Sequence, residues 1–308
     1  MPNHSSFLAY VCALAVLSIG CSEVEDPGPP KPVCGIRSDR TGKTDRKIVF
    51  GGLNREYIVH IPASLDPQKP VPVVYVAHGF FMSGQIMYDQ TRMSELAERD
   101  GFVAIFPTGA GGEADILASP WGVTPADQTA CGLGALVDNK ANDDVALMKA
   151  ILADVQEDQC VDDDAVFFTG FSMGGFLSNH MGCQAGSFVR AIAPHSGGTY
   201  PGGQCSGGPV PVMLLHGTGD GVIDYQCGTQ ARDLWLARNH CSSEFDSKPV
   251  KAGTCDWYRD CDEGGQVVMC SFPDMAHAWA GSEYNLYGTG PDYENANELI
   301  WSFFKSQL

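Results

Sequence analysis

A serine between glycines stands where a strand-like segment meets a helix-like one, and this junction limits the possible folds more than any other feature. Residues 165–180 read AVFFTGFSMGGFLSNH, so apolar, β-prone residues lead through GFSMG into a segment of helical character. The pentapeptide fits the pattern G-x-S-x-G, which places a serine on a tight strand-to-helix turn. Gly170 and Gly174 would supply the small volume that lets strand and helix approach each other. We therefore expect Ser172 to lie on a strained turn after a buried strand.

Strand-like and helix-like segments alternate along the chain, which gives the pentapeptide more weight than it has alone. By itself it is weak evidence, because 21 serines and 36 glycines give about 0.3 accidental matches. The segments that we expect are a β-hairpin at 46–62, strands at 71–79, 102–107, 165–170, 191–196, 210–217 and 266–272, and helices at 91–101, 141–158, from 173, at 224–240 and at 293–307. Such alternation is typical of an α/β fold with a mostly parallel sheet and helices on both faces.

Two stretches show no clear periodicity. Residues 108–140 and residues 241–265 have neither helical nor strand-like spacing of their apolar residues. Structureless segments of this length are usually lids, binding loops or irregular structure held by disulfides. We expect both to be irregular.

The first 40 residues have the composition of an export segment followed by a spacer. Residues 7–19 form a 13-residue apolar run, which suits a signal-peptide core and is too short to span a bilayer comfortably. The run ends in LSIGC, which resembles a bacterial lipobox with Cys21 as the lipid-bearing residue; cleavage near Gly20 with a free secreted product is the alternative. We predict a signal peptide at 1–20, a Pro-rich tether at 21–40 and one domain at 41–308.

The cysteine count favours an oxidising, extracytoplasmic location. Of twelve cysteines, Cys12 would leave with the signal peptide and Cys21 would carry the lipid, so ten remain. Ten thiols permit five disulfides, whose pairing the sequence does not determine. No C-x-x-C pair and no H-E-x-x-H motif occurs, so we expect no metal site. A disulfide-rich, secreted or lipid-anchored protein follows from these observations.

Charge and hydrophobic content exclude two classes of protein. The formal net charge is −18 and no basic cluster stands out, so nucleic acid is not an expected partner. Hydrophobic residues make up 44% of the chain and charged residues 18%, which supports a packed core and argues against disorder. The charge itself says nothing about the fold.

A serine hydroxyl needs a base and an acid to become a nucleophile, and both are expected downstream in the order Ser, Asp, His. His277 fits the base, because it lies in a loop just after the predicted strand at 266–272. Asp220 fits the acid in the loop after the strand at 210–217, with Asp224 in reserve. Loops at the carboxyl ends of parallel strands are where open α/β sheets place their chemistry. Ser172, Asp220 and His277 are therefore the predicted catalytic residues.

The negative oxygen that forms when a serine attacks a carbonyl needs two hydrogen-bond donors. We expect one to be the backbone N–H of Met173, directly after the serine. The second is expected from the loop after VVYVA, where HGFF occurs, and Phe80 is the predicted donor.

Five segments resemble one family of proteins. GLNREYIVHIP, HGFF, FFTGFSMGGFLSN, HGTGDGVIDY and AHAWAG are similar to segments of the secreted α/β-hydrolase esterases, which include feruloyl esterases, acetyl xylan esterases and polyhydroxybutyrate depolymerases. The similarity spans roughly residues 45–305. It implies the α/β-hydrolase fold, with Ser172 as nucleophile, Asp220 as acid and His277 as base. This chain departs from the family's usual pattern at Phe80 and Phe81, where small residues are common.

The resemblance implies hydrolysis of carboxylic esters through an acyl-serine intermediate, with no metal or organic cofactor. Phe80, Phe81 and Trp121 would form an aromatic wall for a hydroxycinnamoyl group, although each is equally suited to the core. We therefore expect a feruloyl esterase-like enzyme acting on plant cell-wall polysaccharide esters, with acetyl xylan or polyhydroxyalkanoate esters as alternatives. A peptidase of the prolyl-oligopeptidase type and a non-catalytic surface binding protein on a hydrolase scaffold are alternatives of other classes.

Overall fold

A computed structural model describes residue 34 and residues 39–112, 121–122, 131, 143–199, 205–285, 288 and 290–308. The chain divides into two units, residues 1–31 and 32–308, and the fold described below is that of the second. The predicted signal peptide, Cys21 and most of the predicted tether and of the 108–140 stretch lie outside the described residues. No helix in the described part is long and apolar enough to cross a bilayer.

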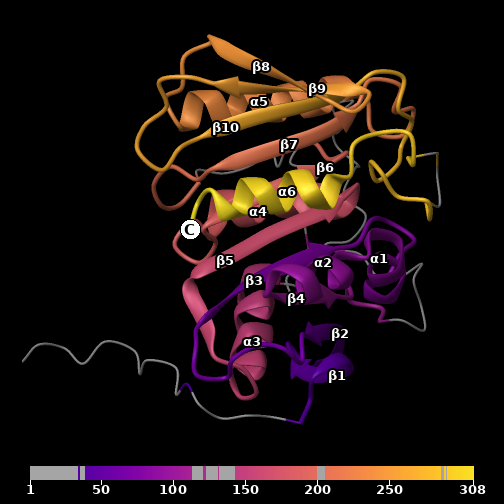
Figure 1. Ribbon diagram of the computed structural model, residues 1–308, viewed down its shortest axis with the longest axis vertical. Coiled ribbons are helices and arrows are strands. Elements are labelled where there is room, and N and C mark those ends of the chain that lie inside the picture. Colours follow the sequence, from indigo (N-terminus) through magenta and orange to yellow (C-terminus); the bar gives the residue numbers. More distant parts are fainter. Residues whose placement is uncertain are drawn as a thin grey trace, which may run out of the picture. The chain divides into compact units, whose positions relative to one another are not determined.

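One sheet organises the described chain, with its strands in the order β1-β2-β4-β3-β5-β6-β7-β10-β9-β8 (Figure 1). The strands are β1 (Gly42–Phe50), β2 (Leu53–Ile61), β3 (Val71–Ala77), β4 (Val103–Pro107), β5 (Val161–Phe171), β6 (Ala191–His195), β7 (Val212–Gly217), β8 (Phe245–Val250), β9 (Gly253–Tyr258) and β10 (Val267–Phe272). The central strands from β4 to β10 pair in parallel, and antiparallel strands flank them on both sides. The parallel pairing brings the carboxyl ends of these central strands to one edge of the sheet.

Helices cover both faces of the sheet, as the sequence predicts. They are α1 (Gly84–Thr91), α2 (Met93–Asp100), α3 (Asp144–Gln156), α4 (Met173–Gln184), α5 (Tyr225–Arg238) and α6 (Ala296–Lys305). Apolar residues of α3, α4 and α5 pack in one core cluster, and those of α1, α2 and α6 pack in the other. The fold is that of an α/β hydrolase.

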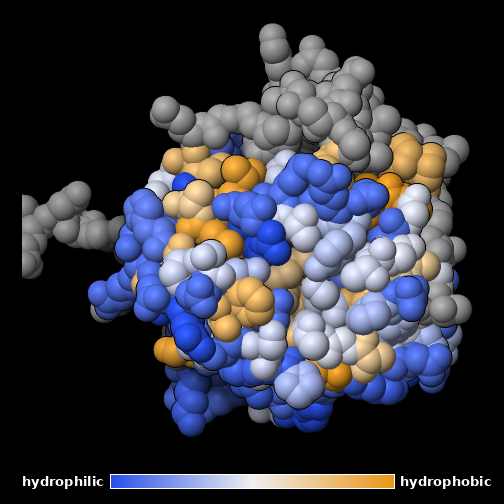
Figure 2. Space-filling view, turned by 90° about the horizontal axis from the view of Figure 1, so that it is seen from above, coloured by the Kyte–Doolittle hydropathy of each residue, from blue (hydrophilic) through white to orange (hydrophobic). Residues whose placement is uncertain are grey.

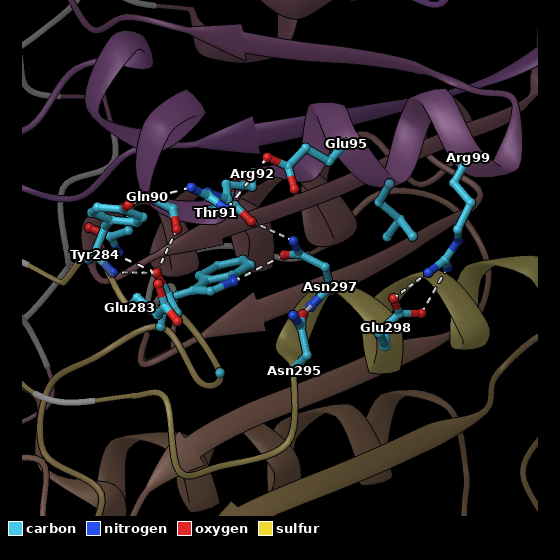
Figure 3. A pocket seen from close by; sticks show the side chains of 14 residues that line it. Gln90, Thr91, Arg92, Glu95, Arg99, Glu283, Tyr284, Asn295, Asn297 and Glu298 are labelled. Atoms are coloured by element: carbon cyan, nitrogen blue, oxygen red, sulfur yellow. Dashed lines mark hydrogen bonds and ion pairs between the residues drawn. The ribbon is translucent and has the colours of Figure 1, made fainter.

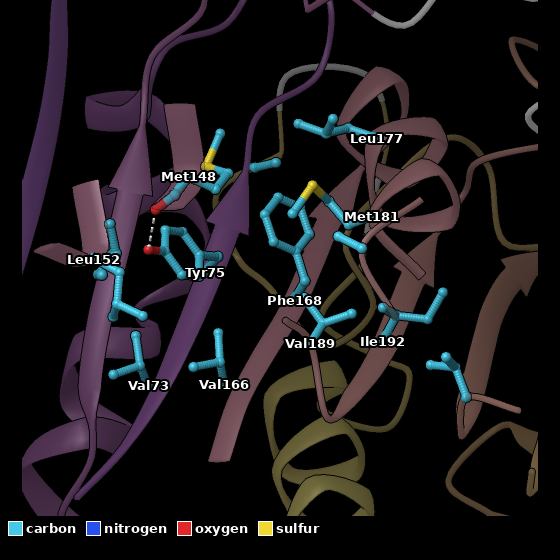
Figure 4. Packing of buried hydrophobic residues seen from close by; sticks show 14 of the residues in the cluster. Val73, Tyr75, Met148, Leu152, Val166, Phe168, Leu177, Met181, Val189 and Ile192 are labelled. Carbon is cyan, nitrogen blue, oxygen red and sulfur yellow. Dashed lines mark hydrogen bonds between the residues drawn. The ribbon is translucent and has the colours of Figure 1, made fainter. Parts of the chain in front are cut away.

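Successive side chains of the central strands point to alternate faces of the sheet, so each strand contributes to both core clusters. In β3, Val73 and Tyr75 belong to the cluster with α3 and α4, whereas Val74 and Val76 belong to the cluster with α1, α2 and α6. This follows from the two-residue period of a strand, since successive side chains point to opposite faces. Tyr75 stacks on Phe168 of β5 and donates its hydroxyl to the main-chain oxygen of Met148 at 2.8 Å (Figure 4). A buried hydroxyl thus has a partner, and α3 is tied to the centre of the sheet.

Two expectations about secondary structure were wrong. The predicted irregular stretch at 241–265 contains the antiparallel hairpin of β8 and β9 at the sheet edge. Most of β8 is exposed and its sequence, FDSKPV, has no apolar alternation, so periodicity does not reveal it. A lysine and a proline on an edge strand hinder pairing with other chains.

One face of the molecule, the top of the view in Figure 1, is drawn in Figure 2. Its described residues are mainly hydrophilic, with small separate apolar areas.

The predicted helix at 91–101 is also different in the structure. Arg92 adopts a left-handed conformation, with φ 52°, and separates α2 from the preceding α1. Helix α1 was not predicted; its N-cap is Ser83, whose side chain accepts a hydrogen bond from the Ile86 N–H. A serine at such a position is a known helix-start signal.

Five disulfides join the ten cysteines that were expected to pair. The pairs are Cys34–Cys160, Cys131–Cys227, Cys183–Cys205, Cys241–Cys261 and Cys255–Cys270. They restrict the unfolded chain at places far apart in the sequence.

Replacement of both Cys183 and Cys205 by Ala should lower the free energy of unfolding. The two residues are separated by 22 positions, and closing a loop of this size contributes about 3 kcal/mol. Urea unfolding of the double variant, followed by tryptophan fluorescence, measures the change. An unchanged midpoint relative to the wild type would contradict a stabilising role for this pair.

Candidate active site

Ser172 occupies a strained turn between β5 and α4. Its φ and ψ are 57° and −117°, a combination that residues with a side chain rarely adopt. The turn is held from both sides, because the Ser172 N–H donates to the His195 carbonyl at 3.0 Å and the Ser172 carbonyl accepts the Gly175 N–H at 2.8 Å. The side chain is therefore fixed at the carboxyl end of a central strand, as the sequence predicts.

The glycines of the pentapeptide allow this turn to lie against β3. A Cβ atom on Gly174 would overlap the carbonyl oxygen of Ala77, and one on Gly170 would overlap the main chain of Gly174. A Cβ atom on Gly79 would stand 3.0 Å from the Ser172 Cβ atom. The turn that follows β3 therefore lies directly beside the serine.

The structure brings Asp220 and His277 together from separate loops. Asp220 follows β7 and His277 follows β10, and His277 Nδ1 donates to Asp220 Oδ2 at 2.7 Å. The other carboxylate oxygen, Oδ1, accepts the backbone N–H groups of Val222 and Ile223 at 3.0 and 2.9 Å. A proton on Nδ1 places the acceptor lone pair of the imidazole on Nε2. The Phe171 ring lies 4.6 Å from that of His277, so the imidazole is beside the strand end that leads to Ser172.

The environment of Asp220 keeps its carboxylate charged. Burial raises the pKa of this group, but the hydrogen bond and charge of His277 and the two backbone donors more than offset burial, so the pKa is lowered overall. Two contacts between the loops fix the pair: the Gly219 N–H donates to the Met275 carbonyl at 3.1 Å, and the Asp274 N–H donates to Thr218 Oγ1 at 2.9 Å.

Two residues at the ends of the acid loop have structural roles. Asp224, the reserve candidate for the acid, caps α5 by accepting the Gln226 N–H at 2.7 Å. His216 lies with its Nε2 atom 2.9 Å from the Ile223 carbonyl, so it ties the two ends of this loop together. Asp220 is therefore the carboxylate of this loop that contacts the predicted base.

His195, at the end of β6, connects the serine turn to the histidine loop, a role that was not predicted from the sequence. Its carbonyl accepts the Ser172 N–H, and its Nε2 atom accepts the Ala280 N–H at 3.1 Å. The ring also stacks on Trp279 at 4.9 Å. Burial, together with the neighbouring histidines His216 and His277, lowers the pKa of His195 to about 3, so the imidazole stays neutral and can accept. The one available signal was its position at the carboxyl end of a strand.

The turn after β3 is held by His78. Its Nε2 atom accepts the Gly109 N–H at 2.9 Å, so the proton lies on Nδ1, which donates to the Gly79 carbonyl at 2.7 Å. The Trp121 indole N–H donates to the His78 carbonyl at 2.8 Å. Trp121 is only 1% exposed, as expected of a core residue and not of an open aromatic wall.

Phe80 and Phe81 lie at the tip of the same turn. Their ring centroids are 3.8 Å apart, and Phe81 is 41% exposed with a left-handed φ of 57°. Phe81 is therefore exposed at the surface, whereas Trp121 is buried. Met173 is the first residue of α4, so its N–H belongs to a helix N-terminus, which favours negative charge. Within the described residues, no group of three or more His, Cys, Asp or Glu side chains is arranged to hold a metal ion.

Replacing His195 with Gln should make the free energy of unfolding less dependent on pH. An unfolded histidine gains its proton near pH 6.5, whereas folded His195 gains it only near pH 3. Between these values the unfolded state binds more protons, so stability falls as the pH falls, by up to about 1.4 kcal/mol per pH unit for one such group. Gln keeps an acceptor for the Ala280 N–H but does not titrate. Urea unfolding between pH 4 and 7 measures both slopes, and equal slopes would refute a neutral buried imidazole.

Comparison with known proteins gives one consistent relationship. The model of the family Phospholipase/Carboxylesterase matches residues 130–254. The chain is 31% identical to feruloyl esterase D of Neurospora crassa, over 95% of this chain and 91% of that protein, and 29% identical to feruloyl esterase C of Emericella nidulans, over 89% and 93%. The structure of an acetyl xylan esterase from Aspergillus awamori superposes with a TM-score of 0.60 at 14% identity, covering 85% of this chain and 99% of that one. The chain therefore belongs to the α/β-hydrolase family of carboxylic ester hydrolases that includes feruloyl esterases and acetyl xylan esterases.

Proposed function

We propose that the protein hydrolyses carboxylic esters through an acyl-serine intermediate, with Ser172 as nucleophile, His277 as base and Asp220 as acid. The observation that carries this proposal is the 2.7 Å hydrogen bond from His277 Nδ1 to Asp220 Oδ2, beside the strand end that leads into the strained turn at Ser172. In the first step Ser172 Oγ attacks the ester carbonyl while His277 Nε2 takes the hydroxyl proton. The Asp220 carboxylate stabilises the imidazolium and holds its tautomer.

The remaining steps use the same residues, with His277 acting first as an acid and then again as a base. The N–H groups of Met173 and Phe80 donate to the negative oxygen of the tetrahedral intermediate. His277 then protonates the leaving alcohol, and the acyl group stays on Ser172. A water molecule, activated by His277, attacks the acyl-serine and releases the acid. No step needs a metal or an organic cofactor.

The substrate that we propose is a feruloyl-type ester of a plant cell-wall polysaccharide. Exposed Phe81 and its neighbour Phe80 offer aromatic surface beside the serine turn, which suits a hydroxycinnamoyl ring. The relatives named as feruloyl esterases support the same acyl group. Acetyl xylan and polyhydroxyalkanoate esters are the alternatives, and their small acyl groups would not use the exposed face of Phe81.

We also propose that the protein works outside the cytoplasm. Five disulfides among the described cysteines are typical of an oxidising compartment. The lipobox-like sequence ending at Cys21 favours attachment to a membrane surface by a lipid over free secretion. Mass analysis of the mature N-terminus, with and without lipase treatment, distinguishes the two forms.

Ser172→Ala should abolish hydrolysis of methyl ferulate, acetylated xylan and hydroxybutyrate oligomers, because the acyl-serine cannot form. The wild type should be most active on methyl ferulate, and a fluorophosphonate probe should label the wild type but not the variant. Initial rates across the three substrates measure specificity. A wild type inactive on all three would refute this substrate class, and absence of labelling would refute the nucleophile.

Asp220→Asn should reduce kcat by about 10⁴-fold, since an amide in this place favours the wrong imidazole tautomer. Asp224→Asn is the matched control in the same loop. Asn also caps helices well, so this second variant should keep both its stability and its activity. Measuring kcat and the unfolding midpoint for both variants separates catalysis from folding. An equal loss of kcat in both would show that Asp220 is not the specific partner of His277.

A further inference from the structure

A polar hollow lies outside the reaction centre, between two helix ends and the loop that follows His277. It has a volume of about 420 Å³ and is bordered by α1, α2, the start of α6 and residues 281–284 (Figure 3). Gln90, Arg92 and Tyr284 stand at one end, and Arg99 and Glu298 at the other. Neither Ser172 nor the Phe80–Phe81 turn contributes to its walls. The hollow is therefore a separate feature of the surface.

Both guanidinium groups of the hollow are paired with carboxylates, which argues against an anionic ligand. Arg99 binds Glu298, with 2.6 Å between Nη1 and Oε1, and Arg92 lies 3.6 Å from Glu95. With Glu283, carboxylates outnumber guanidinium groups among the lining residues, so an anion would meet no uncompensated positive charge. The lining is too polar to suit a purely apolar molecule. A neutral, polar ligand fits these walls.

Gln90 supplies hydrogen-bonding capacity that the protein itself does not use. The residue is 3% exposed, and its amide oxygen and amide nitrogen are both buried without a hydrogen-bond partner in the structure. Its main-chain carbonyl accepts a hydrogen bond from Ser282 Oγ at 2.6 Å, which fixes the residue at the wall of the hollow. A buried amide without partners costs stability. A hydroxyl group can satisfy both atoms, because it donates to Oε1 and accepts from Nε2.

Tyr284 adds an aromatic surface that is held in place. The Arg92 guanidinium lies over the ring at 5.0 Å from its centroid and donates to the Tyr284 hydroxyl at 3.4 Å, yet the residue is 54% exposed. A second hollow of about 490 Å³ lies against the same Arg92 and Tyr284 side chains and reaches His60 and Glu98. An extended ligand can therefore pass from one hollow to the other across the tyrosine ring.

We propose that these two hollows bind a neutral polyhydroxylated chain, namely a stretch of the polysaccharide that carries the ester. The inference rests on the proposed function for the choice of polymer. Sugar rings present C–H groups that pack on an aromatic ring and hydroxyls that pair with amides such as those of Gln90 and Asn295. Tyr284 follows His277 by seven residues, so the two lie within about 25 Å of each other. A polymer held at Tyr284 would keep its esters near the reaction centre at a raised effective concentration.

Titration calorimetry of the full chain with unesterified xylohexaose tests the proposal without any hydrolysis. The wild type should bind saturably, and Tyr284→Ala should weaken binding by about tenfold. Gln90→Leu should weaken it similarly while leaving the unfolding midpoint unchanged or higher, because it removes an unpaired buried amide. Phe245→Ala is the matched control, since it removes a ring of comparable exposure, 45%, from strand β8, which contributes no residue to the lining of either hollow, and it should leave binding unchanged.

Kinetics separate this inference from the proposed function. Tyr284→Ala should keep the wild-type kcat/KM for methyl ferulate and raise KM for a feruloylated xylan. Saturable, Tyr284-dependent binding of xylohexaose by a chain that cleaves no ester would support the site and refute the esterase. If the protein is an active esterase but does not bind xylohexaose, or if Tyr284→Ala binds it equally well, the polysaccharide-binding site is refuted and the proposed esterase function stands.

Discussion

The close approach of the Ser172 turn to β3 is the constraint on which the rest of the site depends. Gly170 and Gly174 meet the main chain of β3 and of the turn itself where no Cβ atom would fit. This contact sets the serine beside Gly79, and the backbone of residue 172 adopts a conformation that a residue with a side chain rarely tolerates. The strain persists because the hydrogen bonds of the turn and the packing of β5 between neighbouring strands hold it.

The loops that carry the proposed catalytic residues lie at one edge of the sheet because the strands before them are parallel. β5, β7 and β10 end at the same edge, and each is followed by a loop that carries one of the proposed catalytic residues. Asp220 and His277 are 57 positions apart in sequence but are joined by a 2.7 Å hydrogen bond. His195 adds a contact between the serine turn and the histidine loop through its carbonyl and its imidazole. The edge is thus tied together by main-chain bonds as much as by the charged pair.

The loop that follows β10 carries His277, the proposed base, and also borders the polar hollow. Ala280 is bound to His195, and Ser282 is bound to the main chain of Gln90, so the loop is anchored on each side. An anchored loop can hold His277 toward the serine and Tyr284 toward the helices at once. The proposed cleavage of an ester and the proposed binding of its polymer therefore share one structural element.

The sequence by itself determined the elements with a strong local signal. The junction at GFSMG and the buried apolar runs were sufficient to predict a mostly parallel α/β sheet and to place Ser172, Asp220 and His277 after strand ends, because strands leave a local pattern in the sequence. The hydrolase fold itself was implied by the resemblance to the esterase family. Tertiary structure alone decided the five disulfide pairings, the β8–β9 hairpin and the roles of His195 and Gln90. These depend on which distant groups meet in space, and neither an exposed edge strand nor a buried amide without partners leaves a periodic trace along the chain.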